Sequence, residues 1–296
     1  MNLKHLLLLS SFLFFGVANA QDDDMLKSLE TDETAVPIPA LFKCNRLVNG
    51  HTTETTAKHH LDYKIHHRFG KVNEGPYQLF GLDKGSMFLG FEYGVTKDFS
   101  VGVSRSTQLK MYTASLKYKL MSQTTKGKKS KPLSIAFLTN IGCNGLSWAD
   151  QGLAGRTNYF SSRLSYVNQL LIARRVHPKL VLQVAPMVLH QNLVTASDEP
   201  NDLFILPVGV NIRLGRSSRL NFEYQPVLNR YKGSSATTPF SIGYDIETGG
   251  HVFQLIISNS QGMVENLTVP FTTGKWQKGD VYFGFNILRF FSLGKR

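Results

Sequence analysis

Charged and polar side chains recur at every second position within apolar segments of this chain. Between residues 61 and 69, Asp62, Lys64, His66 and Arg68 alternate with larger, mostly apolar residues. Because successive side chains of a β-strand point to opposite faces, the polar set shares one face. The residues expected on that face along the whole chain are Asp62, Lys64, His66, Arg68, Glu92, Lys117, Lys119, Arg163, Arg213, Glu223, Asp245 and Glu247. Since both signs of charge are present, this face can form ion pairs or line a cavity for polar solutes.

No motif in the sequence indicates catalysis or a bound metal. GxSxG, HExxH, Walker and EF-hand patterns are all missing from the sequence. Four histidines, His59, His60, His66 and His67, are close in sequence, but alternation sends His66 and His67 to opposite faces, so adjacent pairs cannot converge on one ion. A barrel enzyme would need a serine and a histidine that meet on its outer wall, and nothing marks such a pair. We therefore expect no catalytic residue, no metal and no cofactor.

The elements that must position the polar face are strands. The clearest unit spans residues 239–260, where Phe240, Ile242 and Tyr244 alternate with small or polar residues, and a second alternating arm follows Gly249-Gly250. A short turn between two alternating arms predicts a β-hairpin. From about residue 58 to the C-terminus, the same alternation predicts about twelve strands.

The lengths of the connections indicate how these strands are arranged. Long segments such as 70–85, 142–157 and 260–277 alternate with short ones such as 177–179 and 248–250, and the two exceptions are a short loop near residue 107 and a long turn near residue 128. Long extracellular loops that alternate with short periplasmic turns are typical of outer-membrane barrels. We predict an all-β fold, a transmembrane up-and-down antiparallel β-barrel, with the apolar face toward lipid and the polar face toward the lumen.

The 296 residues divide into three predicted parts. Residues 1–20 combine a basic start, a short apolar run and Ala18-Asn19-Ala20, which predicts a signal peptide. Residues 21–57 are acidic at first and aperiodic, which predicts a periplasmic leader with a short plug or strand at 41–48. Residues 58–296 form the predicted barrel. Export would deliver the chain to the outer membrane.

The net charge of +12 is spread over the chain, except for a cluster of lysines at Lys126, Lys128, Lys129 and Lys131. This cluster is either a solvated turn or a contact with anionic lipid or a periplasmic protein. We expect outer-membrane lipid, the barrel-assembly machinery and a periplasmic protein as partners, and no nucleic acid.

Two further features concern the wall and the thiols. Pro186, Pro207 and Pro226 lie in three neighbouring predicted strands, and each proline removes one ladder hydrogen bond. They are either tolerated bulges or a locally weakened wall that permits lateral access. Cys44 and Cys143 are the only cysteines, and export permits a disulfide between them.

Several segments together resemble a family of Gram-negative outer-membrane β-barrel proteins, common in Bacteroidetes and classed only as a domain of unknown function. They are LDYKIHHRFG, FGLD, SLKYKL, LSYVNQLLIARR, HQNLV, GYDIETGGHVFQLIISNSQGM and GDVYFGFNILRFF. The resemblance covers about residue 41 to the C-terminus. It implies the barrel and its compartment but no substrate. One departure is that Phe290-Phe291 are followed by further residues, whereas such barrels usually end in an aromatic residue.

Three functions remain open at this point. The first is a narrow channel or small-solute transporter without enzymatic activity. The second is a filled barrel that acts as a structural or partner-binding envelope protein. The third, an outer-membrane enzyme, has the least support in the sequence.

Overall fold

The computed structural model describes residues 35–155, 157–194 and 198–294. The predicted signal peptide and the first part of the leader lie outside these residues. No described helix is long and apolar enough to cross a membrane. The strands are β1 (His60–Lys71), β2 (Gly85–Gly94), β3 (Phe99–Ser106), β4 (Tyr112–Met121), β5 (Ser134–Cys143), β6 (Leu164–His177), β7 (Leu180–Val184), β8 (Met187–Gln191), β9 (Asp202–Ile205), β10 (Val208–Arg213), β11 (Ser218–Tyr224), β12 (Phe240–Thr248), β13 (His251–Ser258) and β14 (Tyr282–Ser292).

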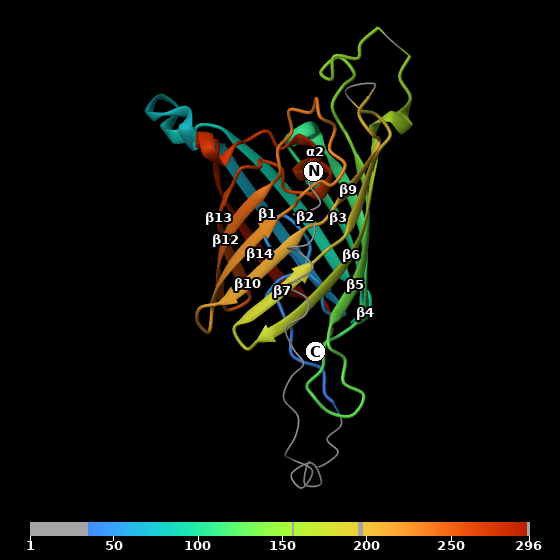
Figure 1. The fold of residues 1–296 in the computed structure, drawn as a ribbon, viewed down its shortest axis with the longest axis vertical. Coiled ribbons are helices and arrows are strands. Elements are labelled where there is room, and N and C mark those ends of the chain that lie inside the picture. Colours follow the sequence, from blue (N-terminus) through green and yellow to red (C-terminus); the bar gives the residue numbers. More distant parts are fainter. Residues whose placement is uncertain (1–34, 156, 195–197, 295–296) are drawn as a thin grey trace, which may run out of the picture.

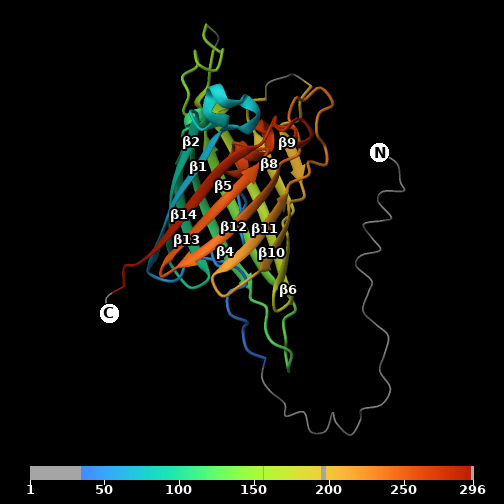
Figure 2. The same ribbon diagram turned by 90° about the vertical axis from the view of Figure 1, so that its left-hand side faces the viewer.

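These segments form one closed antiparallel sheet (Figures 1 and 2). Strands β1 to β6 pair in sequence order, as do β10 to β14, and β1 pairs with β14. Between them, β7 pairs with β6 and β10, and β8 pairs with β6 and β9. Because β7 and β8 are two halves of one strand, and β9 and β10 are halves of the next, the described residues make a twelve-stranded barrel. The prediction of an up-and-down barrel of about twelve strands is confirmed.

The two faces of the wall follow the predicted alternation. In β1 the even-numbered residues from Asp62 to Arg68 are buried in the barrel, and the odd-numbered ones are partly exposed on its outside. Large apolar side chains such as Phe91, Leu116 and Leu255 are exposed on the outer face. An outer face of this kind suits contact with hydrocarbon, and it leaves the backbone groups of the wall paired within the sheet.

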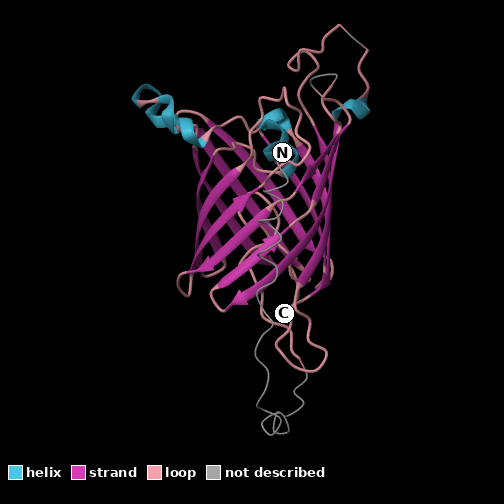
Figure 3. Cartoon of the chain, viewed as in Figure 1, coloured by secondary structure: helices cyan, strands magenta, loops and turns pink. Residues whose placement is uncertain are grey.

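The connections also alternate as predicted, and both exceptions are present (Figure 3). The long loops lie at one end of the barrel, here called the long-loop end, and carry most of the short helices: η2 (Val72–Glu74), η3 (Pro76–Gly81), η4 (Gln108–Lys110), η5 (Phe160–Arg163), α2 (Glu265–Phe271) and η6 (Trp276–Lys278). The opposite end, here called the short-turn end, includes the hairpin turn at Gly249 and Gly250, whose positive φ values of 36° and 98° suit glycine.

The prolines interrupt the strands without a bulge. Val184 pairs with Val208, and Met187 pairs with Ile205, so the register is unbroken across Pro186 and Pro207. Only hydrogen bonds are lost there. The interpretation as tolerated bulges is therefore wrong at these two positions.

The apolar outer face predicts a strong penalty for charge in its middle. Leu116 lies in the centre of β4 and is 48% exposed. We expect Leu116→Arg to destabilise the barrel by about 2–4 kcal/mol, because a cation would face the hydrocarbon. Urea titration of the protein folded in lipid vesicles measures this. Ser235→Arg, in the exposed β11–β12 loop, is the control and should leave stability nearly unchanged; equal effects of the two substitutions would contradict the lipid-facing assignment of β4.

Candidate functional site: a plugged lumen

The lumen is occupied by the chain's own N-terminal segment, residues 41–56, which we call the plug. Leu41, Phe42, Cys44 and residues 45–49 are buried, as are residues 51–53 and Thr56. The segment upstream runs beside the β4–β5 loop, where the amide of Ile38 donates to the carbonyl of Gln123. The segment downstream joins β1 at the same end. The plug thus enters and leaves through the short-turn end, and it is longer than the predicted stretch at 41–48.

The plug folds into a small hairpin inside the barrel. Arg46 and His51 pair as an antiparallel bridge, and the amide of Leu47 donates to the carbonyl of Gly50 at 2.9 Å. Asn49-Gly50 lies in the turn, a pair that favours tight hairpins. The turn places successive backbone N–H groups at the tip of the plug.

The carboxylate of Glu223 on β11 binds this tip. Its Oε2 accepts hydrogen bonds from the amides of Val48 and Gly50 at 3.2 and 2.9 Å, and Asn49 donates to both oxygens. Gln225 donates to Oε1 at 2.6 Å. Charge-assisted bonds of this kind are stronger than neutral ones. Glu223 therefore anchors the tip through backbone groups.

A buried ion pair joins the plug to the long-loop end. Arg46 lies 3.2 Å from Glu265, and the side chains are only 5% and 2% exposed. Glu265 opens α2, which folds inward from the β13–β14 loop and buries residues 265–269 in the mouth of the barrel. The lumen is thus closed from both ends, with Arg46–Glu265 at the meeting point.

A second charged cluster lies between the plug and β1, β2 and β4. Lys64 contacts Glu92 at 2.6 Å, and Lys117 lies 3.7 Å from the same carboxylate. Lys117 also donates to the carbonyl of Glu54 in the plug at 2.7 Å, and Asp62 accepts from the side chains of Asn45 and Thr56 at 2.8 and 2.7 Å. Plug and wall therefore neutralise each other's polar groups.

The remaining inner polar residues hold the plug along its length. Arg68 donates to the side chain of Asn49 at 2.9 Å, and Lys119 pairs with Glu54 at 2.9 Å. Gln254 and Asn286 donate to the plug carbonyls of Leu47 and Val48 at 2.6 and 3.2 Å. His66 is fully buried and stacks on Phe88, and Asp245 accepts from Gln254 at 2.6 Å.

Three predicted lumen residues lie elsewhere. Arg163 ends η5 in the β5–β6 loop, where its guanidinium lies 4.0 Å from the ring centre of Trp148. Arg213 is exposed at the last position of β10 and donates to Gly215. Glu247 is half-exposed near the end of β12 and pairs with Lys43 at 2.5 Å. The prediction extended the alternation to strand ends, where side chains reach the rim and loops instead of the lumen.

Sequence reasoning missed the residues that meet the wall from inside, namely Arg46, Asn49, Glu54 and Glu265. They lie outside the strands, so alternation could not find them. The Asn49-Gly50 pair was the available signal, because it predicts a hairpin turn within the aperiodic leader.

The described histidines and the two cysteines form neither a metal site nor a disulfide. Cys44 and Cys143 are both free, so the disulfide is not formed, and burial raises the pKa of the Cys44 thiol to about 12. No group of three metal-binding side chains occurs within the part of the chain that the structure describes. Both ring nitrogens of buried His51 lack a hydrogen-bond partner.

Residues 42–291 match a family described as a membrane-bound beta barrel domain, DUF5777. The chain belongs to this family. The match confirms the resemblance seen in the sequence and makes the protein a membrane-bound β-barrel. No curated protein matches the sequence significantly.

Solved structures with a similar fold include porins and a channel. The NanC porin is 8% identical with a TM-score of 0.49, and the match covers 78% of this chain and 99% of that chain. The KdgM porin is 9% identical with a TM-score of 0.46, covering 78% and 98%. The COG4313 outer membrane channel from Pseudomonas putida F1 is 11% identical with a TM-score of 0.45, covering 79% and 96%.

The anchoring role of Glu223 can be tested by hydrogen exchange. We expect Glu223→Gln to raise the exchange rates of the amides at residues 48–50 about tenfold or more, because a charge-assisted acceptor contributes about 1.5–3 kcal/mol. Glu247→Gln is the matched control, since its partly exposed pair with Lys43 contributes at most about 1 kcal/mol. Equal protection of residues 48–50 in Glu223→Gln and in the unmodified protein would show that other contacts seat the tip.

The burial of His51 predicts a pH dependence. Burial, followed by the positive charges of Arg46 and Lys117, lowers the pKa of His51 well below its usual value. The imidazole of a withdrawn plug would titrate near 6.5, so below that pH the withdrawn form binds a proton that the seated form excludes. We expect each unit of pH below about 6.5 to favour withdrawal by up to about tenfold.

Exchange of the plug amides between pH 7 and pH 5, corrected for intrinsic rates, measures this withdrawal. His51→Gln is the comparison, since it keeps a polar side chain without a proton site in this range. The same pH dependence in both proteins would assign the effect to other groups.

Proposed function

We propose that the protein is an outer-membrane channel for small polar solutes, exported by its signal peptide, and that the plug closes it in the described state. The observation that carries this proposal is the path of the plug. Because it is a hairpin that enters and leaves at the short-turn end, it can be withdrawn without threading the chain through the barrel. A plug that crossed the lumen from end to end could not be removed in this way.

The polar character of the seat supports reversible opening. Many contacts between the plug and the wall are hydrogen bonds and ion pairs, such as those of Glu223, Arg68 and Lys117. Water can replace each of these charge-assisted contacts at a net cost of about 1.5–3 kcal/mol. After withdrawal the inner wall would present charges of both signs to a water-filled passage, which suits small polar solutes. No serine hydroxyl among the described residues is hydrogen-bonded to a histidine, and we propose no enzymatic reaction.

The force that moves the plug would act at the short-turn end. Pro37, just before the plug, bridges to Thr124 in the β4–β5 loop, which also carries the cluster of lysines at residues 126–131. We propose that a periplasmic protein with an acidic surface binds this loop and the adjoining chain. Such a partner would sit where it can pull on the plug.

The buried Arg46–Glu265 pair favours a second candidate, a permanently filled barrel that serves as an envelope scaffold. Separating this pair without replacing either partner would leave a buried, unpaired charge at a cost of about 3–5 kcal/mol, so the pair opposes withdrawal of the plug unless water enters. A scaffold would need no opening, and the two candidates therefore differ in conductance.

Single-channel conductance in planar bilayers separates the candidates. We expect the unmodified protein to show rare discrete openings, and Glu223→Gln to show more frequent openings of the same size, because the tip is held less strongly. A variant without residues 41–56 should conduct continuously. If only this deletion variant conducts, while the unmodified protein and Glu223→Gln both stay silent, the scaffold is the better description.

A further inference from the structure

Four neighbouring strand pairs each lose one hydrogen bond along a continuous row, which we call the proline row. The carbonyls of Pro186, Pro207, Pro226 and Pro239 accept from the amides of Leu170, Ala185, Leu206 and Gln225, respectively, at 2.9–3.0 Å. In an unbroken ladder the facing residue would return a second bond, but proline has no N–H to donate. The row crosses the wall from β6 to β12. Along this row, each boundary between neighbouring strands from β6 to β12 lacks one ladder hydrogen bond.

An apolar groove lies on the outer surface of this row. It has a volume of about 340 Å³, and outward side chains such as Leu170, Val188, Phe204 and Leu206 line it. Three buried, inward-facing residues, Gln169, Met187 and Ile205, also line it. The floor of the groove is therefore the wall itself at these residues.

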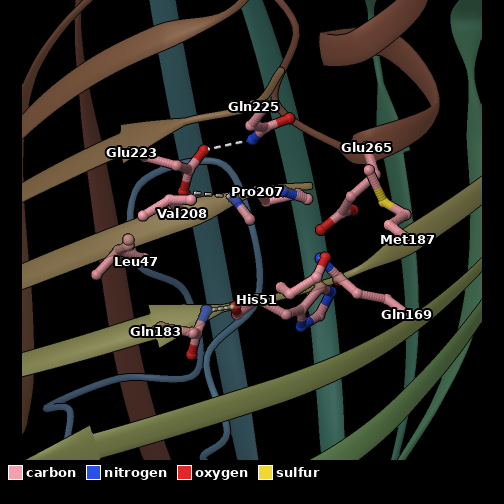
Figure 4. Close-up of a pocket in the computed structure, with 13 residues that line it drawn as sticks. Leu47, His51, Gln169, Gln183, Met187, Pro207, Val208, Glu223, Gln225 and Glu265 are labelled. Atoms are coloured by element: carbon pink, nitrogen blue, oxygen red, sulfur yellow. Dashed lines mark hydrogen bonds between the residues drawn. The ribbon is translucent and has the colours of Figure 1, made fainter. Parts of the chain in front are cut away.

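A small pocket, lined by apolar residues together with several polar side chains, lies behind the groove, inside the barrel (Figure 4). Gln169 and Met187 line this pocket as well, so the wall at these two residues is the partition between the pocket and the groove. The pocket holds about 10 Å³, the space of about one water molecule. Met187 is unbranched and adaptable, so its side chain is the easiest part of the partition to displace.

The pocket contains polar atoms that have no hydrogen-bond partner. They are both ring nitrogens of His51 and the side-chain oxygens of Gln169, Gln183 and Gln225, and all four residues are at least nine-tenths buried. The carboxylates of Glu223 and Glu265 also line it. Figure 4 shows Glu265 facing Gln169 and His51. Because acceptors predominate, the pocket suits a group that donates hydrogen bonds, and its carboxylates would repel an anion.

We propose that the proline row is a lateral binding site for an amphiphile with one acyl chain and a hydroxyl-bearing head, of the monoacylglycerol type. The acyl chain occupies the outer groove, and the hydroxyl head displaces Met187 to reach the unpartnered acceptors. The groove opens among lipid-facing side chains of a membrane-bound barrel, so hydrocarbon is the occupant that its surroundings supply. Binding here does not require the plug to leave, and the proposal does not rest on the proposed channel activity.

Photo-crosslinking of the full-length protein in lipid nanodiscs tests the site. The probe is a monoacylglycerol with a diazirine in its acyl chain, and adducts are mapped by mass spectrometry. We expect saturable adducts on β8 and β9, competed by unlabelled monoacylglycerol and at least tenfold less well by the fatty acid of equal chain length. Adducts spread evenly around the lipid-facing belt, or equal competition by the fatty acid, would overturn the proposal.

Two variants test the parts of the site separately. Gln169→Leu removes one acceptor and should weaken competition by monoacylglycerol about fivefold, the effect of one hydrogen bond. The variant P186V/P207V/P226V restores three N–H donors and should abolish the saturable adducts, whereas Pro178→Ala in the β6–β7 turn should retain them. Gel mobility with and without heating shows that each barrel is folded. Unchanged labelling in a folded triple variant would show that the broken ladder has no part in binding.

Discussion

A narrow barrel in a membrane must neutralise its own interior. The outer face has to be apolar because hydrocarbon offers no hydrogen bonds, and alternation then sends the polar half of every strand into the lumen. Arg68, Lys117 and Glu92 are almost completely buried there, and an unpaired charge at such a depth would cost several kcal/mol. The plug removes this cost, because its carbonyls and side chains supply partners that the strands do not supply to one another.

This constraint explains why the inner polar residues, the plug and α2 form one connected set. Glu92 balances Lys64 and Lys117 within the wall, while Glu223 accepts hydrogen bonds from the backbone amides of the plug. Arg46 adds a positive charge to the lumen, and Glu265 from α2 forms an ion pair with it. A lumen emptied of the plug would need water in all these places, so the proposed open state is a hydrated one.

How far the sequence could predict this structure depends on the range of the interactions involved. Strand faces follow from period-2 patterns that each strand carries by itself, and the up-and-down arrangement follows from the lengths of the connections; these predictions were correct. Arg163 was misplaced because it lies in the β5–β6 loop, beyond the ladder. Arg213 and Glu247 keep their places in the ladder, but at strand ends, where side chains reach the rim instead of the lumen. The partnership of Arg46 with Glu265 spans 219 residues, and no local pattern encodes it. Glu223 was assigned to the lumen correctly, yet its role depends on a turn in the aperiodic leader.

The inner wall is also uneven, and the uneven part explains where the prolines are tolerated. From β5 to β9 the inward side chains include Leu138, Val167, Leu171 and Leu189, which pack in apolar clusters instead of binding the plug. The proline row lies at the edge of this sector. Ladder hydrogen bonds are missing there, and only a thin partition separates the lumen from the lipid. Gln169 partly compensates, because its side chain donates to the carbonyl of Ala185 at 3.4 Å. A polar residue thus stands in for a missing backbone donor.

The pocket behind the proline row is built partly from the plug, which links the two proposals physically. Leu47, Gly50 and His51 line it, and Gln183 holds the carbonyl of His51 at 2.8 Å. Withdrawal of the plug would therefore dismantle the head-group site, and a ligand bound there would contact only the seated form. By linkage, such a ligand stabilises the closed state by as much as the closed state favours the ligand.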